Sequence, residues 1–236
     1  MVRALLDGRK TQTRRIMKVQ PPKNEDFPGS CFGVGRKVAD GVKWVSLNQY
    51  PSLPKHPTKW DLDGSVGVAR AAGFPMEYDA RFAVGDRLWV KETWRGHKSW
   101  DDQKPSEILA CTRVWHEADR DNCDQHGKIR VAIFMPRWAS RITLLVTDVR
   151  VERLQDCSEA DAIAEGIEAR GMGSLWGWID YLETNPNLTR HFADPRRSYE
   201  SLWDRINGPG AWEANPWVVA VTFEVVRGNI DQVAAS

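Results

Sequence analysis

The chain has 236 residues, and its 33 Lys and Arg residues balance 32 Asp and Glu residues to a net charge of +1. This balance excludes a protein that coats nucleic acid through bulk charge, so anion binding must come from local patches. No apolar run reaches the roughly 20 residues of a membrane span and no signal peptide is visible, so we expect a cytoplasmic protein with no membrane partner.

The first predicted element is a short helix followed by a basic stretch. Val2, Leu5 and Leu6 recur at helical spacing, and Gly8 stands where glycine commonly ends a helix. Residues 9–15 hold four cations, three neutral hydrogen-bonding residues and no acid. These side chains suit phosphate or another anion because they form charge-assisted hydrogen bonds. The alternative is a solvated basic patch. The candidate anion-binding residues are Arg9, Thr11, Arg14 and Arg15.

Residues 17–83 show little pattern and are rich in proline and glycine. Within them, residues 43–47 and 65–69 have the composition of short strands. We expect an insertion here rather than an independent domain. Long loops in compact proteins are usually functional or ordered against a neighbouring element.

A clearer strand follows the turn at Gly85, where Leu88 and Val90 alternate with more polar residues. A second polar insertion covers residues 96–129. It contains residues of zinc-ligand type, but their spacing matches no standard metal motif, so we expect no metal ion. These residues are Cys111, His116, Cys123 and His126. No cofactor is indicated, and all four cysteines are expected to be reduced thiols.

Residues 130–134 predict a strand, and residues 141–154 predict the longest strand of the chain. In that long strand the apolar positions change parity between Val146 and Val149, which indicates a β-bulge or a kink. Barrels use such features to curve their strands.

Two arginines flank a tryptophan just before and at the start of this strand. A guanidinium beside an aromatic ring suits a nucleobase and its phosphate, so Arg137, Trp138 and Arg141 are candidate nucleic-acid contacts. The alternative is that these are ordinary surface residues without a binding role.

A helix is predicted over residues 158–165, with Ser158 as N-cap, Asp161 as its capping-box partner and Gly166 just past the end. Glu165 lies in the last turn, where a carboxylate opposes the helix dipole at a cost of about 0.3–1 kcal/mol. A residue at a locally unfavourable position favours a functional role. An ordinary exposed glutamate is the alternative.

The remaining elements are a third insertion, a helix and a closing strand. The insertion covers residues 168–197 and the helix residues 197–207. The strand covers residues 217–226, and a loose tail is expected over 228–236. Five or six strands, two or three helices and no βαβ alternation predict an α+β fold. We expect one domain over residues 1–227, a small, mostly antiparallel β-barrel with flanking helices and long Trp- and Pro-rich insertions.

Four segments of the chain resemble the ASCH proteins, a branch of the PUA-like β-barrels. The first is the basic stretch of residues 8–15, and the second is the Gly-Asp strand of residues 85–90. The third is the helix of residues 158–166, and the fourth is the closing strand of residues 215–223. The pattern is similar to ASCH-domain proteins encoded in phages and prophages, and it implies a PUA-like barrel and RNA or a modified nucleoside as partner.

The resemblance also implies a catalytic set. ASCH proteins of this kind remove the acetyl group from N4-acetylcytidine, and the pattern maps their residues onto Lys10 as proton acceptor, Thr13 as nucleophile and Glu165 as proton donor. Hydrolysis of RNA itself is a variant of this hypothesis. The alternative is a non-catalytic nucleic-acid-binding module of phage or prophage origin. In a regular strand, positions 10 and 13 face opposite ways, so catalysis requires a bend between them.

Overall fold

The computed structural model describes residues 1–17, 20, 32–38, 41–46, 59–62, 67–71, 81–110, 112–119, 121, 123–172, 175–183 and 191–233. The chain forms two compact units. Unit 1 contains residues 1–8, 87–145 and 224–236, and unit 2 contains residues 9–86 and 146–223. The boundaries fall inside two long strands, β9 (Ile142–Arg153) and β13 (Trp217–Arg227).

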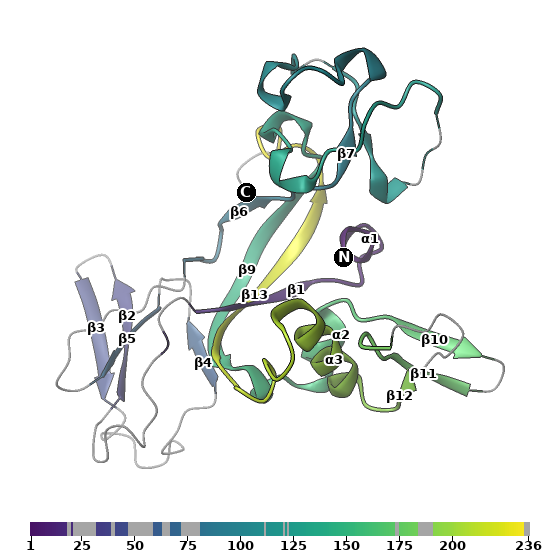
Figure 1. Ribbon diagram of the computed structural model, residues 1–236. Coiled ribbons are helices and arrows are strands. Elements are labelled where there is room, and N and C mark those ends of the chain that lie inside the picture. The colour runs from purple at the N-terminus through teal and green to yellow at the C-terminus, as the bar shows by residue number, and fades with distance from the viewer. Residues whose placement is uncertain are drawn as a thin grey trace. The chain divides into compact units, whose positions relative to one another are not determined.

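Helices and antiparallel sheets occur together, which confirms the α+β class (Figure 1). The largest sheet has the strand order β1-β13-β9-β4, and β6 also pairs with β9. Its further strands are β1 (Gln12–Ile16), β4 (Lys59–Leu62) and β6 (Arg87–Trp89). Within the described ranges no pairing joins the outer strands, so they form no closed barrel there.

Three smaller sheets complete the described strands. One has the order β3-β2-β5, formed by β2 (Phe32–Val38), β3 (Gly41–Ser46) and β5 (Gly67–Ala71). The predicted short strands at 43–47 and 65–69 correspond to β3 and β5, each offset by one or two residues. The second sheet joins β10 (Ala169–Met172), β11 (Leu175–Ile179) and β12 (His191–Phe192). The third pairs β7 (Trp94–Arg95) with β8 (Trp115–His116).

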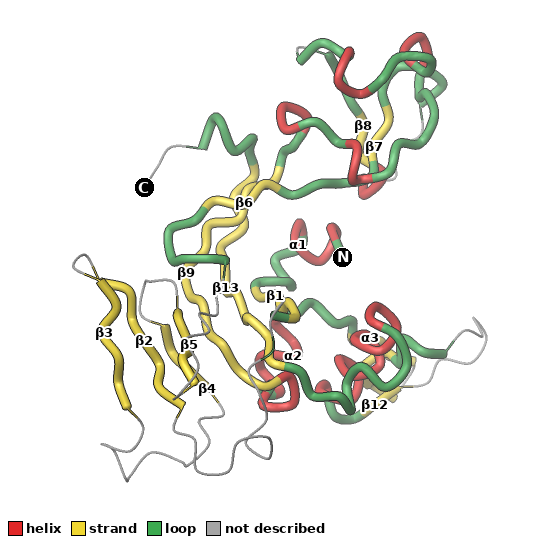
Figure 2. Tube along the Cα trace, turned by 60° about the vertical axis from the view of Figure 1, so that its left-hand side comes forward, coloured by secondary structure: helices red, strands yellow, loops and turns green. Residues whose placement is uncertain are grey.

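Two helices of unit 2 follow the predictions closely. α2 (Glu159–Ala164) begins at the predicted capping box, in which Ser158 Oγ accepts a hydrogen bond from the Asp161 backbone N at 3.1 Å. Gly166 follows it with a φ of +84°, a conformation that glycine adopts without strain. α3 (Pro195–Asn207) begins at the cap Asp194 and ends at Gly208. α2 contacts both β1 and α3 (Figure 2).

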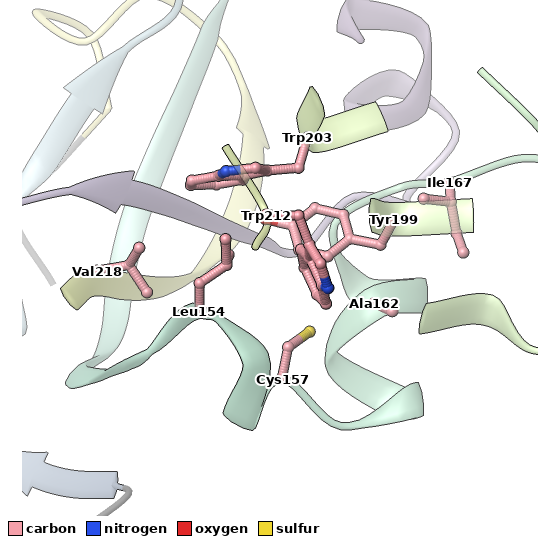
Figure 3. Packing of buried hydrophobic residues seen from close by; sticks show 8 residues of the cluster. All are labelled: Leu154, Cys157, Ala162, Ile167, Tyr199, Trp203, Trp212 and Val218. Carbon is pink, nitrogen blue, oxygen red and sulfur yellow. The ribbon is translucent and has the colours of Figure 1, made fainter. Parts of the chain in front are cut away.

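The core of unit 2 is an aromatic cluster contributed by α2, α3 and the loops that flank β9 and β13. Figure 3 shows its members: Leu154, Cys157, Ala162, Ile167, Tyr199, Trp203, Trp212 and Val218. The Tyr199 ring lies edge-on to those of Trp203 and Trp212, with centroids 6.0 and 5.9 Å apart. Edge-to-face packing of this kind fixes the position of Tyr199.

Unit 1 contains α1 (Val2–Leu6), which ends as predicted at Gly8, where φ is +71°. The prediction of a strand over residues 130–134 was wrong. Residues Ala132–Phe134 form a 3-10 turn, in which Phe134 N donates to Val131 O at 3.0 Å. The apolar side chains of Val131, Ile133 and Phe134 are exposed, so this run lacks the buried face that drives strand formation.

The end of the chain is attached to unit 1 as far as residue 233. The Asn229 side chain donates to the carbonyls of Arg137 and Ser140 at 2.8 and 2.9 Å, and Ile230 is buried. Residues 234–236 of the predicted loose tail lie outside the described residues. None of the helices in the described part of the chain has the length and apolar character needed to cross a bilayer.

Candidate active site

The chain segment that enters β1 is tied to two neighbours at once. Lys10 forms an isolated antiparallel bridge with Glu165, and Thr11 N donates to Ala164 O at 2.9 Å. Thr11 O in turn accepts from Phe223 N of β13 at 2.9 Å. The segment therefore lies between the end of α2 and β13, and this brings Lys10 to Glu165 across 155 residues of sequence.

The Lys10 amine is buried and surrounded by oxygen acceptors. Nζ lies 2.8 Å from Glu165 Oε2, 2.9 Å from Glu165 O and 2.8 Å from Gln12 O. Lys10 is only 3% exposed and Glu165 only 6%. Burial lowers the pKa of Lys10 below its usual value, and the nearby Glu165 carboxylate opposes that shift without reversing it.

Arg14 is 2% exposed and contacts several oxygens. Its Nε and Nη2 both donate to Glu152 Oε1, at 2.9 and 2.7 Å. Its Nη1 donates to Gln12 Oε1 at 2.7 Å and to Glu165 Oε1 at 3.3 Å. The guanidinium therefore links Glu165 to Glu152 of β9 and is not available to an external anion.

A second arginine extends this cluster. Arg150 Nη2 donates to Asp161 Oδ1 at 2.9 Å, and Asp161 Oδ2 lies 3.5 Å from Arg14 Nη2. Burial raises the pKa of Asp161, but hydrogen bonds from Ser158 and Arg150 outweigh it and hold that pKa well below its usual value. Three cations thus face three carboxylates. This buried charge cluster consists of Lys10, Arg14, Arg150, Glu152, Asp161 and Glu165.

The charge cluster borders the aromatic core of unit 2. The Arg14 guanidinium lies 5.9 Å from the centroid of the Tyr199 ring. Burial and the Glu165 charge raise the pKa of the Tyr199 hydroxyl well above its usual value, so this phenol stays neutral. An apolar surface beside the cluster lowers the local dielectric constant, which strengthens every charge interaction in it.

Thr13 occupies a different position from Lys10 and Glu165. It lies in β1 opposite Val221 and is half-buried. Gln12 and Arg14, its neighbours on either side, are buried, so Thr13 projects from the other face of the strand. The structure therefore brings Lys10 and Glu165 together and gives the Thr13 side chain no hydrogen bond to another described residue.

The other predicted binding residues fall into two groups. Arg9, Thr11 and Arg15 are exposed on unit 2. Arg9 Nη2 lies 4.0 Å from Glu168 Oε1, and Arg15 Nη1 donates to Arg14 O at 3.2 Å. These three residues remain accessible to a ligand.

The second group, Arg137, Trp138 and Arg141, belongs to unit 1. Arg137 Nη2 pairs with Asp231 Oδ1 at 2.7 Å. Arg141 bridges Glu92 and Asp119, at 3.0 and 2.7 Å. The half-buried Trp138 packs against the cluster around Trp94. Both guanidinium groups thus have carboxylate partners.

The residues of zinc-ligand type show other contacts. His116 Nε2 lies 3.1 Å from Ala139 O, and the His126 ring lies edge-on to Trp115 with centroids 4.9 Å apart. Cys123 is a free thiol, and Cys111 lies outside the described residues. Within the described ranges no three His, Cys, Asp or Glu side chains are grouped to hold a metal ion.

Sequence reasoning missed five members of the site: Gln12, Arg150, Glu152, Asp161 and Tyr199. A signal for two of them was present. Arg150 and Glu152 alternate with Val149 and Val151 near the end of β9, and these two charges occupy one face of the strand. Both faces of β9 are buried over residues 149–152. The apolar positions change parity in the sequence there because one of the two buried faces carries Arg150 and Glu152 in place of apolar side chains.

Comparisons with protein-family models, curated proteins and solved structures found no match to this chain. The resemblance to ASCH proteins therefore stays a prediction.

Proposed function

We propose that this chain is a hydrolase of an N-acylated nucleoside of the N4-acetylcytidine type, with Lys10, Thr13 and Glu165 as its catalytic residues. The observation that carries the proposal is the buried contact of 2.8 Å between Lys10 Nζ and Glu165 Oε2. A non-catalytic basic patch has no need of a lysine and a glutamate in direct contact and withdrawn from water. The PUA-like ASCH assignment is part of this proposal.

The pair has the properties that the two roles require. The reaction requires Lys10 to act as a neutral amine and Glu165 to supply a proton. The lowered pKa of Lys10 favours the neutral amine. A neutral amine accepts a proton and a protonated carboxyl donates one.

The chemical steps follow from these roles. Thr13 Oγ attacks the acetyl carbonyl while its proton passes to Lys10 Nζ. Because Thr13 projects from the opposite face of β1, this step requires the chain to bend between residues 10 and 13. The bond between the carbonyl carbon and N4 breaks, and N4 takes the proton of Glu165 to leave as the free amine. Water then hydrolyses the acetyl ester of Thr13 to acetate. Transfer of the proton from Lys10 back to Glu165 along their hydrogen bond restores the starting state.

A second candidate function is non-catalytic binding of RNA, in a phage or prophage setting. The exposure of Arg9, Thr11 and Arg15 favours it, because these donors reach solvent while their neighbours Lys10 and Arg14 do not. Under this hypothesis the charge cluster only stabilises the fold.

The test is turnover of N4-acetylcytidine, followed by chromatographic separation of cytidine, in parallel with an incubation of single-stranded RNA. Thr13→Val removes the hydroxyl and keeps a β-branched side chain suited to a strand. Thr147→Val, at an exposed position of β9, is the matched control. We expect turnover by the wild type and the control, and none by Thr13→Val. Equal turnover by all three proteins would refute Thr13 as the nucleophile, and no turnover by the wild type would refute the hydrolase.

A further inference from the structure

The β10-β11-β12 sheet of unit 2 presents a row of aromatic rings on one face. Residues directly opposite in an antiparallel pair share a face. Trp176 lies opposite Gly171, and Trp178 lies opposite both Ala169 and Phe192. Trp176, Trp178 and Phe192 are therefore on the same face, which we call the aromatic row.

The row is supported at one end and open at the other. Trp178 is half-buried against the aromatic core, whereas Trp176 is 72% exposed. The two indole rings lie edge-on with centroids 5.9 Å apart, which holds the exposed ring in place. Their cross-strand neighbours Gly171 and Ala169 are too small to cover them.

A cation lies at the supported end of the row. The Arg197 guanidinium from the first turn of α3 lies 5.0 Å from the centroid of the Phe192 ring. Arg197 is exposed and forms no salt bridge within the described ranges. An exposed Trp and an exposed guanidinium on the same face offer a stacking surface for bases and a partner for phosphate.

We propose that the aromatic row binds single-stranded RNA, so that the substrate of the chain is an acylated cytidine within an RNA strand rather than a free nucleoside. This inference rests on the proposed function, which makes the strand RNA. The row stacks unpaired bases and Arg197 contacts a phosphate. The bases of a duplex are stacked on one another and cannot reach the indole faces.

The row is part of the same unit as the candidate active site. β10 begins four residues after Glu165, and Ile167 between them is buried in the aromatic core. Gly177 keeps β12 close to β11, because a Cβ at that position would approach His191 Cβ to 2.8 Å. β10, which pairs with β11 of the row, thus directly follows the segment that carries Glu165.

The test is fluorescence anisotropy with a labelled, unmodified 12-nucleotide single-stranded RNA, and with the same sequence as single-stranded DNA and as duplex RNA. We expect the single-stranded RNA to bind most tightly. Trp176→Ala should weaken that binding about 5- to 150-fold, the usual range for loss of one stacking ring. Arg197→Ala should reduce the salt dependence of binding by a slope of roughly 0.7. Phe134→Ala, an aromatic residue 62% exposed in unit 1, should leave binding unchanged.

Unchanged binding in Trp176→Ala would overturn the inference, as would equal or tighter binding of the duplex or the DNA. Because the RNA carries no acetyl group, this result is independent of turnover. Hydrolysis of free N4-acetylcytidine without RNA binding would refute the aromatic row and leave the hydrolase intact. Binding through Trp176 without hydrolysis by any variant would refute the hydrolase alone.

Discussion

The two sides of the basic stretch have opposite surroundings. Lys10, Gln12 and Arg14 are buried and hydrogen-bonded to protein oxygens, whereas Arg9, Thr11 and Arg15 are exposed. The sequence presents these residues as one cationic patch, but the strand divides them by alternation. One side is an internal charge cluster that holds Glu165, and the other is a surface that meets solvent or a ligand. Substitutions on the two sides should therefore affect different properties.

The largest expected effect comes from Arg14→Met. It leaves Glu152, Asp161 and Glu165 without the guanidinium that they share, and breaking a buried charge pair typically costs about 3–5 kcal/mol. The free energy of unfolding in urea measures this loss. The exposed counterpart Arg15→Met should change it by less than about 0.5 kcal/mol. Equal losses in the two variants would contradict the division between the two sides.

A smaller loss is expected from Gln12→Leu. The Gln12 side chain accepts from Arg14 Nη1 at 2.7 Å and donates to Thr222 Oγ1 at 3.1 Å, so the leucine leaves a buried guanidinium and a half-buried hydroxyl without this partner. The expected loss is about 1–3 kcal/mol of unfolding free energy. Thr11→Val, on the exposed side, serves as control. A Gln12→Leu protein as stable as the Thr11→Val control would show that the hydrogen bonds of the buried side add nothing.

The charge cluster should also affect how the free energy of unfolding depends on pH in acid. The pKa of Asp161 is lower in the folded protein than in the unfolded chain, so its contribution to stability is complete above the unfolded pKa. It is lost as the pH falls below about 4. Asp161→Asn should therefore lose less unfolding free energy than the wild type between pH 5 and pH 2. Parallel acid curves for the two proteins would indicate that Asp161 has no depressed pKa.

The smallest effect on stability, with a clear effect on binding, is expected from Arg9→Ala. The Arg9 side chain is exposed, and its contact with Glu168 is a surface ion pair with a long distance of 4.0 Å. Its loss should therefore change the free energy of unfolding by less than about 0.5 kcal/mol. If the exposed side contacts RNA phosphate, this variant should weaken RNA binding at low salt and reduce its salt dependence. Anisotropy over a salt series measures both quantities.

Local patterns predicted most of the regular elements. Periodicity and capping residues located α1, α2 and α3, because the signals at Gly8, Ser158 and Gly208 act within a few residues. Alternation located β9 and β13. The 3-10 turn at residues 132–134 was missed because its composition resembles that of a strand, whereas the apolar side chains of Ile133 and Phe134 are exposed.

The charge cluster depended on long-range pairing that no local pattern encodes. Lys10 and Glu165 were connected only through the resemblance to ASCH proteins. Nothing near Arg14 in the sequence indicates that it reaches Glu152, 138 residues away. Tyr199 appeared as one apolar position of α3, and its place beside Arg14 follows from the packing of α3 against α2.

The account depends most on whether Lys10 accepts a proton or merely carries a charge. Lys10→Arg separates the two, because an arginine carries a positive charge beside Glu165 but does not lose its proton near neutral pH. The decisive measurement is the turnover of N4-acetylcytidine by this variant, with its folding checked by circular dichroism. The account predicts a folded protein whose turnover is about 10²–10⁴-fold below that of the wild type. A folded Lys10→Arg protein with wild-type turnover would contradict it.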